Sequence, residues 1–370
     1  MSTGDGGSSS ADRLLAVQSS RHAPLLKGAL GFGLMAILPY VVTVSLFGIT
    51  LNRWISVHIL IVTLVWAFTA QSWNIMSGYA GQFSFGHVAF FGIGAYATQV
   101  LLVDFSINPW FGLLVGSVIA ACYGLFAGFL TFRYKLRGHF FALATLAFGE
   151  LARLFVTNIR ELNGASGYFR PSPGEYGLEF GLFAFQFNSD LPYYYLILVF
   201  LLVVTVVSWL IRRSSVGLYL LAIRENETAA SSLGISPYRY KMLAVAVSAF
   251  FTAWAGSFWS MYFNTISPST VFDIFRNVEI LLPALLGGIG TVAGPILGSF
   301  IVTPLSNIAR QTFGDVASLD RAIYGALLLL VILFSPRGVL GWSEQFRGFF
   351  GNRTSAPVSE APDTDESDAD

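Results

Sequence analysis

The sequence predicts an all-α integral membrane protein, a polytopic bundle of helices. Of its 370 residues, 54% are apolar and only 11% are charged, whereas a soluble domain usually carries about 25% charged residues. The apolar runs are continuous and lack the alternation of a transmembrane strand, so they favour helices over a barrel. This composition excludes a soluble enzyme and a nucleic-acid-binding protein.

The predicted membrane spans are mostly uncharged runs near the length of about 20 residues that a crossing helix needs. In chain order they are Ala29–Leu51, Trp54–Trp73, Phe85–Val103, Pro109–Phe132, His139–Asn158, Leu191–Ile211, Met242–Ile266, Ile280–Ala309 and a last run from Ala322 to Gly341. Glu150 and Arg153 interrupt the fifth run, and their i, i+3 spacing predicts that they pair with each other. The run Ile280–Ala309 is too long for one crossing, and we expect it to cross twice with help from flanking residues.

Basic residues between these runs predict the orientation, because short loops rich in Lys and Arg stay in the cytoplasm. They gather before the first run, in two loops and after the last run: Arg13, Arg21 and Lys27; Arg133, Lys135 and Arg137; Arg212, Arg213, Arg224, Arg239 and Lys241; Arg337, Arg347 and Arg353. If all of these groups are cytoplasmic, both termini are cytoplasmic and the number of spans is even. We therefore expect about ten transmembrane helices, or about eight if the glycine-rich segments are re-entrant.

The predicted organisation is one transmembrane domain between two polar ends. Residues 1–24 and 343–370, rich in Gly, Ser, Pro and acidic residues, are predicted to be disordered and cytoplasmic. Residues 25–342 form the transmembrane domain, with an acid-biased external loop at 159–190 and a cytoplasmic segment at 213–241. The single Cys122 excludes an intramolecular disulfide, and the scattered His residues form no ligand cluster, so no metal or cofactor is expected.

A dense run of glycines predicts an interrupted helix at residues 78–96. It begins with Gly78, Gly81, Gln82, Ser84, Gly86 and His87, and each Gly destabilises a helix by about 1 kcal/mol relative to Ala. One interpretation is close helix packing through small residues. The other is a broken helix whose free backbone groups, with Gln82, Ser84 and His87, line a substrate path, because such backbone is tolerated at membrane depth only inside protein or along a watery cavity.

A second glycine-rich segment lies in the other half of the chain, at residues 286–298. Gly290, Gly294 and Gly298 are spaced four apart, which is typical of a packing face. Paired interruptions in the two halves of a membrane domain predict a site at their interface, so Gly288 and Gly290 join the predicted path. The sequence contains no G-x-x-x-x-G-K-[ST] loop, so any ATP used must be hydrolysed on another polypeptide.

The segment Ser214–Lys241 is too polar to span the membrane and too rich in helix formers to be a plain loop. Its apolar residues recur with a helical period up to Gly234, a natural helix stop, and Pro237 follows. We interpret it as one cytoplasmic helix presented to a partner protein, with the small Ala229 and Ala230 at its tip. The alternative is an amphipathic helix lying at the membrane surface.

These segments together resemble the permease subunits of the branched-chain amino acid family of ATP-binding-cassette importers. The matching stretches are NIMSGYAGQFSFGHVAFFGIGAYA, RGHFFALATLAFGELAR, SSVGLYLLAIRENETAASSLGI with YKMLAVAVSAFFTAWAGS, LLGGIGTVAGPILGS and LFSPRGVLG, in order over residues 70–342. The order and the RGxxFA element match the second of the family's two paired permeases. The chain departs from the family's Thr-Gly-Gly turn at Leu162–Gly167 and inserts GLEFGLFAFQFNSD before Tyr193, which leaves the substrate class open.

The resemblance implies a multi-pass transport subunit in the cell membrane of a prokaryote, with no catalytic residues and no nucleic acid partner. Its implied partners are a second permease, two ATP-binding-cassette ATPase subunits, an external substrate-binding protein and membrane lipid. The pore would carry branched-chain amino acids. Motion of the ATPases would reach the spans through the residues Arg224, Glu225, Asn226, Glu227, Ala229, Ala230 and Gly234. The alternatives are a urea or short-amide permease of the same family, or an ion-coupled secondary transporter, which the scarcity of buried carboxylates disfavours.

Overall fold

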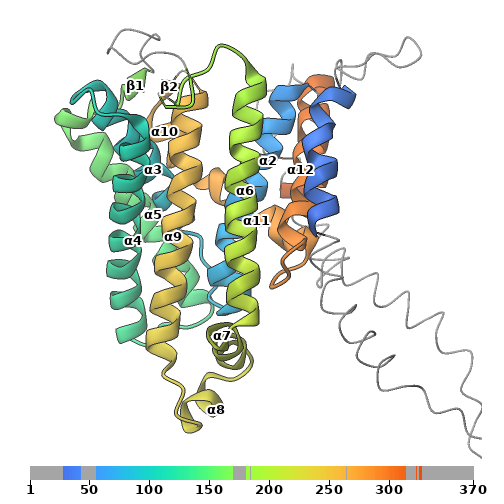
Figure 1. Cartoon of the computed structure of the whole chain (residues 1–370). Coiled ribbons are helices and arrows are strands. Elements are labelled where there is room, and N and C mark those ends of the chain that lie inside the picture. Colours follow the sequence, from blue (N-terminus) through green and yellow to red (C-terminus); the bar gives the residue numbers. More distant parts are fainter. Residues whose placement is uncertain are drawn as a thin grey trace, which may run out of the picture.

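The structure, a computed structural model, describes residues 28–42, 56–169, 181–183, 185–263, 265–313, 322 and 325–326. Within these ranges the chain forms a bundle of long helices with short elements at its two ends (Figure 1). The prediction of an all-α membrane protein is confirmed. The two ends that are predicted to be disordered, and most of the predicted last span, lie outside the described residues.

Long apolar helices alternate with short elements along the chain. In order they are a helix at Gly28–Val42, α2 (Val57–Asn74), the π-helix η2 (Ile75–Tyr79), α3 (His87–Val103), α4 (Pro109–Arg133), α5 (His139–Asn158), the 3-10 helix η3 (Arg160–Leu162), β1 (Tyr168–Phe169), α6 (Asp190–Arg213), α7 (Ser215–Glu225), α8 (Glu227–Ser232), α9 (Pro237–Tyr262), β2 (Thr265–Ile266), α10 (Pro268–Val271), α11 (Ile274–Gly287) and α12 (Gly294–Phe313). The strands β1 and β2 pair antiparallel, with Tyr168 opposite Ile266. Figure 1 shows this pair at one end of the bundle and α7 and α8 at the other, so the segments predicted to lie outside and inside the cell are at opposite ends.

Five of the described helices are long and apolar enough to cross a membrane. They are Val57–Tyr79, Pro109–Arg133, His139–Asn158, Asp190–Arg213 and Pro237–Tyr262. At a rise of about 1.5 Å per residue, the 20 residues of α5 extend for about 30 Å, which matches the hydrocarbon thickness of a bilayer. Three shorter apolar helices, Gly28–Val42, His87–Val103 and Gly294–Ile308, add to them. The total of about ten spans and the cytoplasmic position of both termini stay predictions.

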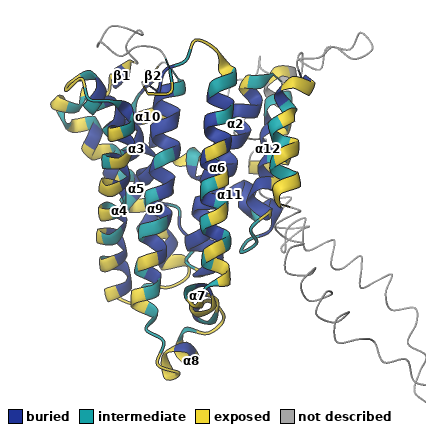
Figure 2. Ribbon diagram, in the orientation of Figure 1, coloured by how far each residue is buried: buried dark blue, intermediate teal, exposed yellow. Residues whose placement is uncertain are grey.

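The continuous helix formed by α2 and η2 is the centre of the bundle. Of its most apolar stretch 94% is buried, against 28% for the corresponding stretch of α5. Figure 2 shows the same contrast, with α2 buried and with exposed faces on α4 and α5. Exposed apolar side chains such as Phe126 and Phe155 suit a surface that meets lipid. The other helices therefore pack around the element that carries the first glycine-rich segment.

The predicted run Ile280–Ala309 is divided into two helices, α11 and α12. The helix α11 begins at Ile274 rather than Ile280, so it includes Arg276 and Glu279. Its 14 residues extend for about 21 Å, less than the thickness of about 30 Å that a crossing requires. By itself α11 is therefore too short for the first of the two expected crossings. Pro283 inside the helix and Gly288 at its end, with φ +122°, explain why the helix stops there.

The first glycine-rich segment contains both a helix break and closely packed glycines, while its role as the lining of a substrate path stays a prediction. The segment from Ala80 to Gly86 is not helical, whereas Gly92 and Gly94 lie inside α3. A Cβ on Gly94 would collide with the backbone of Ala253 in α9, and a Cβ on Gly256 of α9 would collide with the backbone of Phe91. The helix α3 and its neighbour therefore approach through small residues, as membrane helices commonly do.

The segment 213–241, which is predicted to be cytoplasmic, contains two helices, which corrects the prediction of one. Asn226 has an extended backbone, with φ −155° and ψ 104°, and separates α7 from α8. Its side-chain oxygen accepts hydrogen bonds from the amides of Thr228 and Ala229, each at 3.0 Å. This Asn is therefore the N-cap of α8, a position that Asn favours over a helix interior. Gly234, with φ +85°, follows α8 at the predicted stop.

Candidate functional site

The helix α2 ends in a break at the first glycine-rich segment. It widens into η2, and after Ala80 the backbone runs without helical hydrogen bonds from Gly81 to Gly86. Side chains form hydrogen bonds with backbone groups that the break leaves without helical partners. Trp73 donates to the carbonyl of Ser84 at 2.9 Å, Ser77 to that of Gln82 at 2.9 Å, and the Phe85 amide donates to Thr145 Oγ1 at 3.0 Å. Ser84 and Gly86 are buried, whereas Gly81 is exposed and the other residues of the break are half-buried, so the chain itself encloses only part of the break.

His87 begins α3 and lies fully buried beside the break. Its Nε2 lies 2.7 Å from Ser248 Oγ, and its Nδ1 lies 3.1 Å from Ser84 Oγ. Ser248 donates its own proton to the carbonyl of Ser72 at 2.7 Å, so it accepts from His87 Nε2–H. Ser84 accepts from the amide of Gly86 at 3.1 Å and is left to donate to Nδ1. These bonds join α2, α3 and α9, and they place His87 and Ser84 in a packed interior.

The second glycine-rich segment lies directly against the first. Gly290 donates its backbone amide to Asn74 Oδ1 at 2.7 Å, although 216 residues separate the two. Asn74 Nδ2 donates to the carbonyl of Thr291 at 2.8 Å. A Cβ on Gly78 would stand 2.8 Å from the amide nitrogen of Gly290. Asn74, the last residue of α2, therefore joins the end of this helix to the second glycine-rich segment by two hydrogen bonds.

Arg224, in the last turn of α7, also contacts this junction. Its Nη1 donates to the carbonyl of Gly78 at 2.6 Å. A Cβ on Gly81 would stand 2.9 Å from Arg224 Cγ, and a Cβ on Gly290 would stand 2.5 Å from Arg224 Nη1. Both glycines have positive φ angles, +68° and +79°, which favour glycine. Three segments that the sequence singled out separately thus meet at one side chain.

The other residues of the predicted coupling helix divide into inward and outward groups. Glu227 accepts from Lys241 Nζ at 2.8 Å and Arg137 Nε at 3.3 Å, so it ties α8 to α9 and to the loop before α5. Ala230 is only 3% exposed and faces the chain itself. Ala229 and Glu225 are exposed, and Leu233 is 82% exposed. The surface available to a partner therefore carries Ala229 rather than Ala230.

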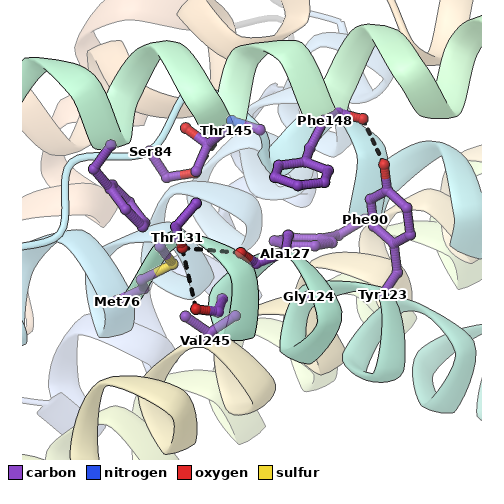
Figure 3. Close-up of a pocket in the computed structure, with 13 residues that line it drawn as sticks. Met76, Ser84, Phe90, Tyr123, Gly124, Ala127, Thr131, Thr145, Phe148 and Val245 are labelled. Atoms are coloured by element: carbon purple, nitrogen blue, oxygen red, sulfur yellow. Dashed lines mark hydrogen bonds between the residues drawn. The ribbon is translucent and has the colours of Figure 1, made fainter. Parts of the chain in front are cut away.

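A small cavity lies against the break, between α3, α4 and α5 (Figure 3). Its volume is about 20 Å³, enough for about one water molecule. Figure 3 shows Ser84, Thr131 and Thr145 among apolar neighbours such as Phe90 and Phe148. Its complete lining is Met76, Ser84, Gly86, Phe90, Tyr123, Gly124, Ala127, Gly128, Thr131, Phe141, Thr145, Phe148 and Val245. Space for a larger molecule at this point would require the surrounding helices to move.

Two ion pairs with i, i+3 spacing lie within the helices α5 and α11. Arg153 donates to Glu150 with its Nε at 2.9 Å and 3.0 Å, which confirms the predicted pair. Sequence analysis did not identify Arg276, which donates to Glu279 at 2.8 Å and lies over the rings of Trp259 and Trp66, at 4.5 Å and 5.4 Å from the centroids. The signal that could have found it is its i, i+3 spacing from Glu279. Among the described residues, no group of His, Cys, Asp and Glu could hold a metal ion.

A polytopic helical membrane chain whose two halves each carry an interrupted segment, with both segments in contact, has the features of a transport subunit. Comparison with known proteins identifies the family. The chain belongs to the family described as the permease component of the branched-chain amino acid transport system, whose pattern matches residues 55–332.

Individual relatives agree with this assignment. The high-affinity branched-chain amino acid transport system permease protein LivM of Escherichia coli K12 is 28% identical over 303 residues, which cover 77% of this chain and 70% of LivM. The corresponding permease protein LivH is 33% identical over 138 residues, 36% of this chain and 42% of LivH. The ribose import permease protein RbsC of Haemophilus influenzae is 30% identical over a stretch of the same length, 138 residues. No solved structure matches the chain.

Proposed function

We propose that the chain is the permease subunit of an ATP-binding-cassette importer and forms part of the translocation path for branched-chain amino acids. It lies in the cell membrane of a prokaryote, beside a second permease. Similarity to LivM over 77% of the chain, against 36% for LivH, supports the assignment to the second of two paired permeases. The observation that carries the proposal is the family match over residues 55–332. The contact between the two interrupted segments supports it.

In this proposal ATP is hydrolysed on separate subunits. The 370 residues contain no phosphate-binding G-x-x-x-x-G-K-[ST] loop. The cytoplasmic helices α7 and α8 instead offer an exposed surface to an ATPase, formed by Glu225, Ala229 and Leu233. Exposed apolar side chains such as Leu233, beside a charge and a small residue, suit a protein interface. An external binding protein would meet the opposite end of the bundle, near β1 and β2.

The path runs along the junction of the two interrupted segments. Gly78, Gly81 and Gln82 from the first segment and Gly288 and Gly290 from the second remain its proposed lining, with backbone carbonyls and amides as the polar groups. Ser84, Gly86 and His87 would act indirectly, because they hold α3 and α9 against the break. Substrate passage then requires the junction to open, since the adjacent cavity holds about one water molecule.

The substrate class is tested by uptake. The chain, produced together with the second permease, ATPases and binding protein encoded beside it, should import radiolabelled leucine. Excess isoleucine and valine should compete, and excess urea or acetamide should not. Uptake of urea with no uptake of leucine would assign the chain to the urea and short-amide branch of the family. Failure to recover ATPases with the purified chain would overturn the proposal as a whole.

A further inference from the structure

We propose that Arg224 is the residue that transmits movement of the cytoplasmic helices to the two interrupted segments. This inference rests on the proposed function, because the movement would come from the ATPase subunits. In the structure the guanidinium hydrogen-bonds the carbonyl of Gly78 at 2.6 Å. The same group stands where any side chain on Gly290 would have to go. Arg224 is therefore a positioning residue that acts on the path through backbone contacts.

The helix α7, which carries the backbone of Arg224, is packed closely against its neighbours. The helix α7 buries Gly217, Leu220 and Ile223, and Ile223 directly precedes Arg224. A Cβ on Gly217 would collide with the carbonyl of Ile211, so α7 packs closely against the end of α6. A displacement of α7 must consequently displace the guanidinium too, because close-packed elements shift as rigid pieces.

The two interrupted segments that Arg224 contacts are joined to each other by hydrogen bonds. Asn74 bonds both Gly290 and Thr291, and it lies one helical turn before Gly78. Pulling on the carbonyl of Gly78 therefore acts on both interrupted segments together. Arg224 is thus linked to the junction by its hydrogen bond to Gly78, by the single turn of backbone from Gly78 to Asn74, and by the two hydrogen bonds of Asn74.

A simple cap for a free carbonyl would be the less demanding explanation, because Arg often bonds the last carbonyls of a helix. Two further contacts argue for more than a cap. The Cγ of Arg224 fills the space beside Gly81, and its Nη1 fills the space beside Gly290. Both glycines have positive φ angles. Glycine at each of these positions leaves room for the arginine between the segments.

The experiment compares Arg224→Ala and Arg224→Lys with the wild type in the complete importer. Arg133→Ala is the matched control, since Arg133 is also exposed, lies at the same end of the bundle and contacts the ring of Phe129. Gly290→Ala tests the contact from the other side, with Gly138→Ala as its control. Gly138 has φ +54° but open space around its Cβ position, so its variant carries backbone strain without a collision.

Two readouts are measured on the purified complex. The first is leucine imported per ATP hydrolysed in proteoliposomes. Arg224→Ala and Gly290→Ala should lower this ratio about tenfold or more, as expected for loss of a charge-assisted hydrogen bond. Arg224→Lys should recover part of it because its ammonium can still donate. The second readout needs no substrate: addition of the non-hydrolysable nucleotide AMP-PNP should change hydrogen exchange at residues 75–86 and 286–294 in the wild type, and this change should disappear in Arg224→Ala.

The outcomes separate the transmission role from the proposed function. If Arg224→Ala retains the nucleotide-dependent exchange and the wild-type import ratio, Arg224 is only a cap and the inference fails, while the importer assignment stands. The inference also fails if the wild type shows no nucleotide-dependent change in these segments. If no ATPase binds the chain, the proposed function fails first. A loss of import in Arg133→Ala equal to that in Arg224→Ala would assign the effect to charge at this surface.

Discussion

Glu227→Gln should loosen α8 from the bundle, because Glu227 holds it through two ion pairs. Lys241 is nearly buried, with its side chain 4% exposed, and its Nζ lies 2.8 Å from the carboxylate. Breaking a fully buried pair costs about 3–5 kcal/mol. The Glu227 side chain is 24% exposed and that of Arg137 is 59% exposed, and exposed pairs contribute about 0–1 kcal/mol. Between these limits we expect a loss of about 2 kcal/mol, or roughly thirtyfold in the docking equilibrium of α8.

Hydrogen exchange of the α8 amides in the purified chain measures this equilibrium directly, since local opening sets the exchange rate. Glu227→Gln should raise their rates roughly thirtyfold, with α3 unaffected. Lys241→Met removes the buried charge and can pack on Phe132, whose ring lies 5.5 Å from Lys241 Nζ. The double variant should therefore be less open than Glu227→Gln alone, a coupling that a double-mutant cycle reports. Unchanged exchange in Glu227→Gln, or strictly additive effects in the cycle, would refute the ion-pair explanation.

Three further predictions concern the partner surface, the break and the orientation. Ala229→Glu should lower the amount of co-purified ATPase about tenfold or more, while the amides of α8 stay protected from hydrogen exchange. Ala230→Glu should instead increase hydrogen exchange in α8, because it buries an unpaired charge. The reverse pattern would place Ala230 at the interface. Gly86→Leu should lower leucine uptake and leave membrane insertion intact, because a Cβ would stand 2.5 Å from the carbonyl oxygen of Thr145. Normal uptake would show that α5 can move away from Gly86 without loss of transport. Reporter fusions at Ser20 and Ala356 should both be active in the cytoplasm. External activity at either site would contradict the predicted orientation, and external activity at only one of them would rule out an even number of spans.

The parts of the fold that sequence analysis predicted are those set by local composition. Long, mostly uncharged runs predicted α2, α4, α5, α6 and α9, and the density of glycines predicted the break after α2. The i, i+3 spacing marked the pair of Glu150 and Arg153. Each of these signals is contained within a short stretch of chain, so no knowledge of tertiary contacts is needed to use it.

The parts that were missed depend on a single capping residue or on distant contacts. Asn226 divides the segment 213–241 into two helices, and in the second of them Ala230 is buried while Ala229 is exposed. A pattern extended through Asn226 as one helix therefore groups Ala229 with Ala230 and does not separate the exposed residue from the buried one. Asn74 carries no local signal at all, since its partners Gly290 and Thr291 are more than 200 residues away. The sequence accordingly indicated both interrupted segments but not the side chains that join them.

The most direct test of the assignment as an ATP-driven permease is the energy source of leucine uptake. Proteoliposomes containing the complete importer, with binding protein and labelled leucine outside, are prepared with or without ATP inside and with or without proton and sodium gradients. We expect uptake only with internal ATP, at the same rate whether or not a gradient is imposed, and none with the chain alone. Uptake driven by an ion gradient in the absence of ATP would contradict the account and identify the chain as a secondary transporter.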